Sequence, residues 1–456
     1  MNLQPAFAPY RADPKIASLG DKIGDPVSAA NFPKTVLRYR NDRWAATVGL
    51  DQLTDAQWIA HFGRFEPLPD NLPQPLALRY HGHQFRHYNP NIGDGRGFLF
   101  AQMRDGLGRL LDLGTKGSGT TPYSRDGDGR LTLKGAVREI LATEMLEALG
   151  VETSKTFSVI ETGEDLMRGD EPSPTRSAVL VRLSHSHIRI GAFQRIAYED
   201  DAAMMQRLVS YCLDNLYEVP HGDNPAATLL NLAVERVADQ AASYMVAGFV
   251  HGVLNTDNIN ITGESFDYGP WRFTEFWDPT FTAAYFDHEG LYAFGRQAEA
   301  MHWNLAQLAI SLRLICEAPP VVAALERFPA LFQSALIRRF LWRLAVFSRG
   351  DADDRNLIEA AEKAMIRGKI SIDTFFARYR GGHVATPAED DDAVSFEGLL
   401  GAYATPQRPQ IPTCGMLIDE VEAIWSAISE RDDWSPLQEK IVAIREYGAA
   451  LRSGLV

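Results

Sequence analysis

The feature that most restricts the fold is a change of hydrophobic period near residue 198. Between residues 98 and 184 the apolar residues form runs of strand length, such as FLFAQM, RLLDLGTK and SAVLVRLS, with one helical stretch at residues 131–150. After residue 198 the runs are long and follow a helical period, as in AATLLNLAVERVADQAASYMVAGFV. We therefore expect an α+β protein with a small β-rich lobe followed by a large helical lobe.

Four segments are expected from these patterns. Residues 1–75 are rich in proline and form an N-terminal extension, in which FPKTVLRY and WAATVGL are predicted to be short strands. Residues 76–197 form the small lobe, residues 198–380 the helical lobe, and residues 381–456 a C-terminal helical extension. The glycine- and acid-rich stretch RGGHVATPAEDDDAVSFEG is predicted to be a surface loop.

Charge and cysteine content limit the class of protein. The net charge is −14, so the surface repels phosphate backbones and we expect no nucleic-acid partner. The three cysteines, Cys212, Cys316 and Cys414, are far apart and lack zinc spacing, which favours a reducing compartment. No secretory start and no apolar run of about 18 residues is found, so we expect a cytoplasmic protein without a membrane span.

The stretch HGVLNTDNINITGESFDYGP, which begins at His251, has the spacing of a protein-kinase catalytic loop. Kinases use H-R-D-x-x-x-x-N followed by D-F-G, in which the first aspartate is the base and the asparagine and second aspartate bind magnesium. Here Asn258 and Asp267 take the two metal-binding positions, whereas Val253 replaces the base. Asp257 could supply the missing carboxylate from another direction; the alternative is an ordinary turn or cap residue.

Lys116 and Glu139 form a second kinase-like pair. Lys116 ends a predicted strand and Glu139 lies 23 residues later on the predicted helix. A strand lysine held by a helix glutamate fixes a cation against nucleotide phosphates. The alternative is two exposed surface charges, which is the usual situation for these residue types.

Two glycine-containing loops and two arginines are candidates for phosphate binding. Gly93, Gly95 and Arg96 precede the first strand of the 98–116 hairpin, where backbone N–H groups could approach phosphate oxygens. A second loop holds Asp128 and Gly129. The alternative for both is an ordinary turn.

Arg182 and Arg189 flank the sequence LSHSHI and could both point into one cleft, or could equally be solvated arginines near a strand end. His81, His83 and His87 suggest a zinc site, but no fourth ligand is evident, which favours structural histidines.

These motifs together resemble the selenoprotein O (SelO, YdiU) family of protein adenylyltransferases, a branch of pseudokinases. The resemblance is strong over roughly residues 75–310 and rests on the ordered motifs HQF…GDGRG, LDLGTKGSGTTPYSRDGDGRLTLKGAVREIL, VRLSHSHIRIGAF, HGVLNTDNINITG and FDYGP. It implies a two-lobed protein-kinase-like fold in which ATP lies flipped. AMP, rather than phosphate, would then be transferred to Ser, Thr or Tyr hydroxyls of proteins, with self-modification included.

The resemblance also implies roles for individual residues. Asp257 would accept the proton, and Asn258 and Asp267 would bind Mg²⁺, with Mn²⁺ as an alternative. Lys116 would contact phosphate and be held by Glu139. The nucleotide would be bound by Gly93, Gly95, Arg96, Asp128, Gly129, Arg182, Arg189 and Asp267.

Some positions depart from the family pattern and leave two other functions open. Arg86 stands where the family often has glycine, Leu291 stands where it has arginine, and the chain ends in AALRSGLV without a redox pair. One alternative is a kinase that transfers the γ-phosphate, which the apolar Val253 argues against. The other is a non-catalytic pseudokinase scaffold that binds ATP.

Overall fold

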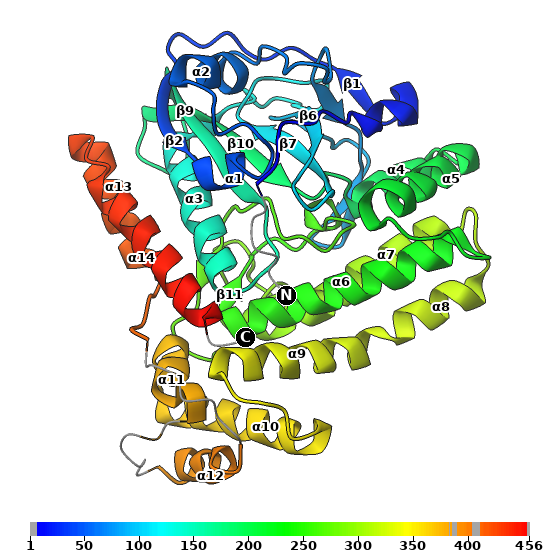
Figure 1. Ribbon diagram of the computed structural model, residues 1–456. Coiled ribbons are helices and arrows are strands. Elements are labelled where there is room, and N and C mark those ends of the chain that lie inside the picture. The colour runs from blue at the N-terminus through cyan, green and yellow to red at the C-terminus, as the bar shows by residue number, and fades with distance from the viewer. Residues whose placement is uncertain (1–6, 383, 385–389, 404–410, 454–456) are drawn as a thin grey trace.

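The computed structural model describes residues 7–382, 384, 390–403 and 411–453. A lobe built on a β-sheet lies next to a lobe made mainly of helices (Figure 1). The predicted α+β architecture, a small β-rich lobe followed by a large helical lobe, is confirmed. The boundaries proposed between the four segments stay predictions.

The small lobe is built on one eight-stranded sheet. Its order is β1-β3-β6-β7-β10-β9-β2, β8 pairs with β10, and these pairs are antiparallel. The strands are β1 (Gly24–Pro26), β2 (Val36–Arg40), β3 (Leu76–Leu78), β6 (Leu99–Arg104), β7 (Leu110–Lys116), β8 (Leu131–Thr132), β9 (Lys155–Leu166) and β10 (Thr175–Ser184). Since β1 and β2 precede residue 76, the N-terminal segment completes this sheet.

The prediction of a strand at WAATVGL is wrong. Helix α1 (Asp42–Ala45) covers its first two residues, and the side chain of Asn41 caps this helix by accepting a hydrogen bond from Trp44 N. The apolar residues of this stretch lie in the end of the helix and in the turn after it, and they are buried there. A short apolar run does not distinguish these conformations from a strand.

Aromatic residues cover the outer face of the sheet. Helix α2 (Asp55–Gly63) starts with a capping box, in which Thr54 Oγ1 accepts from Gln57 N and Gln57 Oε1 accepts from Thr54 N. The helix places Trp58 and Phe62 against Phe157 of β9, with ring centroids 4.9 and 5.4 Å away. This packing buries the outer face and leaves the other side of the lobe to form the cleft.

Helix α3 (Leu133–Ala148) packs on β9 and β10. Ala136, Ile140 and Met145 of this helix are all buried. The helix is buried on its other sides as well, because helices α13 (Ile418–Arg431) and α14 (Ser435–Arg452), drawn in red in Figure 1, lie beside it.

Two ion pairs fasten these C-terminal helices to α3. Arg445 Nε donates to Glu144 Oε2 at 2.9 Å, and Lys134 Nζ lies 2.7 Å from Glu422 Oε2. The C-terminal segment therefore contacts the small lobe directly, although it follows the helical lobe in the sequence.

The helical lobe is arranged around α6. This helix begins at Pro225, after the cap Asn224, and ends before Gly248, whose φ of 70° suits glycine. It packs against α7, α8 and α9. The helices of the C-terminal half and the linking region are α4 (Ile190–Tyr198), α5 (Ala202–Tyr211), α6 (Pro225–Ala247), α7 (Gln297–Leu312), α8 (Ala318–Glu326), α9 (Phe328–Leu344), α10 (Asp351–Gly368), α11 (Ile372–Tyr379) and α12 (Asp391–Leu400).

Within the described ranges, one stretch, Ala318–Leu344, is long and apolar enough to cross a membrane by composition alone. It consists of α8 and α9, which pack against α6. Core helices of globular lobes pass the same compositional test, so the stretch is weak evidence for a span.

The expected surface loop at RGGHVATPAEDDDAVSFEG is partly wrong. Its second half forms α12, which begins after Asp390 accepts hydrogen bonds from Asp392 N and Ala393 N. Residues 383 and 385–389 of this stretch lie outside the described residues. An acidic run is typical of a surface loop, but here Asp391 and Asp392 lie in the first turn of α12, where negative charges stabilise a helix.

Candidate active site

A cleft of about 710 Å³ lies between the two lobes. Residues of both lobes line it, and they include nearly all positions that the sequence analysis singled out. The predicted residues that line the cleft are Gly93, Gly95, Arg96, Lys116, Asp128, Gly129, Arg182, Arg189, Asp257, Asn258 and Asp267. The remaining predicted residue, Glu139, lies behind Lys116.

Lys116 and Glu139 form a buried ion pair. Lys116 Nζ donates to Glu139 Oε2 at 2.8 Å, and their side chains are 6% and 1% exposed. Lys116 is the last residue of β7, and α3 carries Glu139 across the sheet to meet it. An unpaired charge in this position would be costly, so the pair holds the ammonium group in a fixed place at the cleft.

Asp267 lies among three cations. Its Oδ1 accepts from Arg182 Nη1 at 2.9 Å and lies 3.7 Å from Lys116 Nζ, and its Oδ2 accepts from Arg189 Nη1 at 2.6 Å. Burial by itself would raise the pKa of the Asp267 carboxyl. The positive charges of Arg182, Arg189 and Lys116 outweigh burial and hold this pKa well below its ordinary value.

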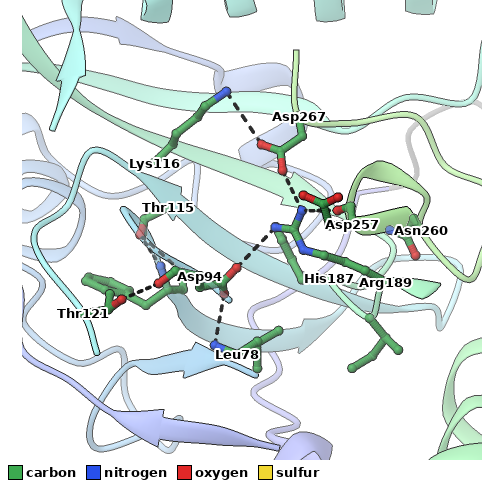
Figure 2. A network of polar contacts seen from close by, with 12 residues as sticks. Leu78, Asp94, Thr115, Lys116, Thr121, His187, Arg189, Asp257, Asn260 and Asp267 are labelled. Carbon is green, nitrogen blue, oxygen red and sulfur yellow. Dashed lines mark hydrogen bonds and ion pairs between the residues drawn. The ribbon is translucent and has the colours of Figure 1, made fainter. Parts of the chain in front are cut away.

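Arg189 connects several of these groups. Figure 2 shows its guanidinium between Asp267, Asp257 and Asp94. Arg189 Nη1 also donates to the backbone carbonyl of Asp257 at 2.8 Å, and Nη2 lies 3.3 Å from Asp94 Oδ1. One arginine at the start of α4 therefore ties the glycine-rich loop to the catalytic loop.

Asp257 lies in a short 3₁₀ turn, η3 (Thr256–Asn258), at the cleft. Its Oδ2 accepts a long hydrogen bond of 3.4 Å from Gln84 Nε2. Its Oδ1 has no hydrogen-bond partner among the described residues. Burial raises the pKa of the Asp257 carboxyl from 3.8 to about 6, although the charge of Arg189 opposes the increase. The carboxyl can therefore accept a proton near neutral pH.

Asn258 and Asp267 offer oxygen atoms suited to magnesium. Asn258 Nδ2 donates to the carbonyl of Val253 at 2.9 Å, which leaves its amide oxygen for another ligand. Among the residues that the structure describes, no group of three His, Cys, Asp or Glu side chains could hold a metal ion. The two residues fit Mg²⁺ only as part of a shared site, because Mg²⁺ commonly combines one or two protein ligands with substrate phosphates and water.

The glycines of the first loop make room for the second loop. A Cβ atom on Gly93 would lie 2.5 Å from the Tyr123 ring, and one on Gly95 would lie 2.9 Å from the Tyr123 carbonyl oxygen. Thr121 Oγ1 donates to the carbonyl of Asp94 at 2.6 Å and joins the loops further. Arg96 is exposed at the rim of the cleft.

Asp128 lies in the second loop, and its carboxyl is already engaged. Arg168 Nη1 lies 2.8 Å from Asp128 Oδ2, and Arg130 N donates to Asp128 Oδ1 at 2.9 Å. Asp128 is thus placed to shape the loop, and Gly129 follows it with a φ of 69°.

The sequence analysis did not single out five further residues that line or support the cleft, namely Gln84, Asp94, Tyr123, Arg168 and His187. His187 Nε2 accepts from Arg182 Nε at 3.2 Å, so its proton lies on Nδ1, which is 3.3 Å from Asp112 Oδ2. Asp94 has a visible signal, since it stands between two of the chosen glycines. His187 lies within the quoted sequence LSHSHI, five positions after its partner Arg182. Gln84, Tyr123 and Arg168 have no such signal, because their partners are remote in the sequence.

Two of the three histidines considered for zinc, His81 and His83, take other partners. His81 Nδ1 contacts Tyr88 Oη at 2.8 Å, and His83 Nδ1 accepts from Gln194 Nε2 at 2.7 Å. Burial lowers the pKa of His81 to about 4 and also lowers that of His83, so both rings are neutral at pH 7.

Taken together, the cleft holds a cation cluster and one carboxylate oxygen free to act as a base. Lys116, Arg182 and Arg189 suit phosphate oxygens, and Arg182 and Arg189 can exchange the Asp267 carboxylate for phosphate. This combination is suited to transferring a phosphorus group from a nucleotide to a hydroxyl.

Comparisons with known proteins point to one family. A family model described as Protein adenylyltransferase SelO matches residues 7–399. A protein of Synechococcus elongatus named Protein nucleotidyltransferase YdiU is 41% identical over 98% of this chain and 97% of its own length. One of the same name from Synechocystis sp. is 41% identical over 94% and 96%.

A search of solved structures matches the specific rhoptry antigen kinase domain of Toxoplasma gondii. The TM-score is 0.28 and the identity 11%, over 63% of this chain and 84% of that chain.

Proposed function

The chain belongs to the SelO family of protein adenylyltransferases, and from this premise we propose that it transfers AMP from ATP to serine, threonine or tyrosine hydroxyls of proteins. It is a nucleotidyltransferase by family. The acceptor residues, the metal ion and the orientation of ATP belong to the proposal.

The observation that carries the proposal is the Asp257 carboxyl, whose Oδ1 lacks a partner among the described residues that surround it. Val253, which stands where a kinase has its base, also lines the cleft but cannot accept a proton. A base that has moved from position 253 to position 257 approaches the nucleotide from another direction. This displacement favours attack at the α-phosphorus over attack at the γ-phosphorus.

The proposed step begins when the acceptor hydroxyl oxygen attacks the α-phosphorus of ATP. A new O–P bond forms, the bond from the α-phosphorus to the bridging oxygen of the β-phosphate breaks, and pyrophosphate leaves. The hydroxyl proton passes to the Asp257 carboxyl. The product is a protein with AMP attached through a phosphodiester.

The cation cluster would bind the phosphates. Lys116 is fixed by Glu139 at 2.8 Å, and Arg182 and Arg189 would turn from Asp267 towards phosphate oxygens. The three cations surround Asp267, and Lys116 and Arg182 are buried, which supports an orientation of ATP in which the β- and γ-phosphates lie deep in the cleft. The glycine-rich loop and Arg96 would complete the binding site.

A bound Mg²⁺ would neutralise charge on the phosphates, and Mn²⁺ has the same ligand preferences. Asn258 and Asp267 would hold the ion together with the nucleotide. Asp267 is ionised at neutral pH because the neighbouring cations, despite burial, keep its pKa low, so it is ready to act as a ligand.

The partners follow from the same chemistry. The acceptors would be proteins with exposed hydroxyls, and the enzyme itself is one of the proteins to test. The net charge of −14 argues against nucleic acid as an acceptor. The buried free thiols of Cys212, Cys316 and Cys414 are consistent with a reducing compartment, and we propose the cytoplasm.

Labelled ATP tests the proposal directly. The protein is incubated with Mg²⁺, bacterial lysate proteins and ATP labelled at either the α- or the γ-phosphate. We expect α-label on protein, release of pyrophosphate and an AMP mass increment on Ser, Thr or Tyr peptides. Label from the γ-phosphate alone would show a kinase, and no label from either ATP would favour a scaffold.

Matched variants complete the test. Asp257→Asn should lower labelling by roughly 10²- to 10⁴-fold, which leaves a small residual rate. Asp353→Asn, a substitution of the same kind at an exposed position on α10, should label like the wild type. Full labelling by Asp257→Asn would remove Asp257 as the base.

A further inference from the structure

A small hairpin from the N-terminal lobe contacts three successive residues of the catalytic loop. The hairpin consists of β4 (Gly82–Gln84) and β5 (His87–Asn89). Three hydrogen bonds join it to residues 255–257, from His83 N to Thr256 Oγ1 (2.7 Å), from Phe85 N to Asn255 Oδ1 (3.0 Å) and from Gln84 Nε2 to Asp257 Oδ2 (3.4 Å). These contacts span about 170 positions of sequence, so they depend on the tertiary fold.

The orientation of the Gln84 amide is fixed by its neighbours. Asn89 Oδ1 accepts from Asn91 N at 2.9 Å, so the Asn89 amide nitrogen points to Gln84 Oε1, to which it donates at 3.1 Å. Because Gln84 Oε1 accepts that bond, the Gln84 amide nitrogen faces Asp257. Each group in this chain therefore has a set donor or acceptor role, and the chain ends on the carboxyl.

A glycine lets the hairpin come this close to the loop. A Cβ atom on Gly82 would lie 3.1 Å from Asp257 Oδ1 and 3.1 Å from Thr256 Oγ1. Both distances are tighter than ordinary contacts. A larger residue would push against the side of Asp257 that has no hydrogen bond.

The same loop is tied to α4 through Thr256. Thr256 Oγ1 donates to Gln194 Oε1 at 2.6 Å, and Gln194 Nε2 donates to His83 Nδ1 at 2.7 Å. With the bond from His83 N to Thr256 Oγ1, a closed ring of hydrogen bonds joins the hairpin, the catalytic loop and α4.

The tip of the hairpin is in an unfavourable conformation. Phe85 and Arg86 have φ values of 48° and 63°, a region that residues with side chains adopt rarely and that this type of two-residue turn requires. The Phe85 ring packs 5.0 Å from the Tyr292 ring, and Arg86 lies over the Trp303 ring at 5.4 Å. These ring contacts hold the tip of the hairpin against the helical lobe.

We propose that the β4–β5 hairpin positions the general base: Gln84 donates to Asp257 Oδ2 and Gly82 lies beside Oδ1, so that the carboxyl is held in one orientation at the cleft. Gln84 is then a positioning residue that acts through Asp257. This inference rests on the proposed function, because it takes Asp257 as the base.

Substitution of Gln84 with leucine tests the proposal. Leucine fills similar space but cannot donate to the carboxyl. Transfer from α-labelled ATP should fall about 10- to 100-fold in kcat, as losses of supporting hydrogen bonds do at active sites, while the KM for ATP stays unchanged. A merely structural defect would change both constants and would lower the melting temperature.

A double substitution gives a second measurement. Since Gln84 acts only through Asp257, Gln84→Leu should cause no further loss in the residual rate of Asp257→Asn. Multiplied losses in the double variant would overturn the proposal. An unchanged kcat for Gln84→Leu alone would overturn it as well.

Gln52 provides the matched control. Its amide also donates to an aspartate, Asp51 Oδ2 at 2.6 Å, but on the exposed surface. Gln52→Leu removes the same kind of bond and should leave kcat unchanged. An equal loss in this control would show that the effect of Gln84→Leu is not specific to the base.

Arg86→Gly separates the role of the tip from that of Gln84. Glycine adopts positive φ without strain, so this variant should keep the hairpin folded and retain kcat. Loss of kcat in Arg86→Gly with normal stability would contradict the role given to Gln84, because Gln84 is intact there.

Failure of this inference is distinct from failure of the proposed function. A wild-type protein that transfers no α-label removes the proposed function and the base with it. A wild-type protein that transfers AMP, together with a fully active Gln84→Leu, overturns only the role of the hairpin.

Discussion

Replacing Asp257 with asparagine should make the protein more stable at neutral pH while it removes most of the activity. Burial raises the pKa of Asp257 from 3.8 to about 6 in the folded protein. The ionised carboxylate is therefore less favourable in the folded state than in the unfolded chain. Asparagine has nearly the same shape and carries no charge at any pH.

The size of the effect follows from this shift in pKa. A shift of roughly two units corresponds to about 3 kcal/mol of unfolding free energy. Since the folded state holds the proton more tightly, the stability contribution of Asp257 falls as the pH rises from about 4 to about 6 and stays low above that range. The variant should thus gain about 3 kcal/mol near pH 7.5, about half of that near pH 5, and almost nothing below about pH 4.

Urea denaturation at several pH values, without nucleotide or metal ions, measures this difference. Asp353→Asn is the control, because Asp353 is 54% exposed and pairs with Arg349 at 3.4 Å on the surface. It should change the unfolding free energy by less than about 1 kcal/mol at each pH. The reasoning is refuted if Asp257→Asn is no more stable than the wild type at neutral pH, or if its gain persists in acid.

Three further outcomes are expected. Asp267→Asn should have the opposite sign and lower the unfolding free energy by about 3–5 kcal/mol in denaturant, because it removes the negative charge that the buried Arg182 and Arg189 share with Lys116; a neutral effect would contradict the cluster. Lys116→Ala and Glu139→Ala should each reduce AMP transfer strongly, and the double variant should be no worse than the single ones; additive losses would show independent roles. Chelation of divalent ions, or Asp267→Ala, should abolish transfer and weaken binding of Mg·ATP in calorimetry; full activity in either experiment would exclude the metal site.

The local patterns predicted the elements and the positions of the kinase-like residues. The strand runs of β6, β7, β9 and β10 and the helix α3 appear where the periodicity indicated. Lys116 ends β7 and Glu139 lies on α3, the next helix, although residues 117–132 separate the two elements. A residue pair of this kind can be anticipated from the order of the elements.

Contacts between remote segments could not be anticipated in this way. The bond from Gln84 to Asp257 joins residues 173 positions apart, and the contact of Arg168 with Asp128 depends on how two loops fold back. The sequence pattern indicates that Gly93 gives backbone N–H groups access to phosphate. In the structure, its lack of a side chain also leaves room for the Tyr123 ring. One sequence pattern can have two physical causes, and only the tertiary arrangement separates them.

The docking of α13 and α14 on α3 has a consequence for control of the enzyme. In protein kinases the equivalent helix can swing outward, which breaks the lysine–glutamate pair and switches activity off. Here Arg445 forms an ion pair with Glu144, which lies five residues after Glu139 on α3. A second ion pair joins Lys134 to Glu422. Because α13 and α14 hold α3 in place, the Lys116–Glu139 pair stays formed without any activating signal. Inhibition by movement of α3 would first require α13 and α14 to detach; otherwise an inhibitor would have to act on the loops that line the cleft.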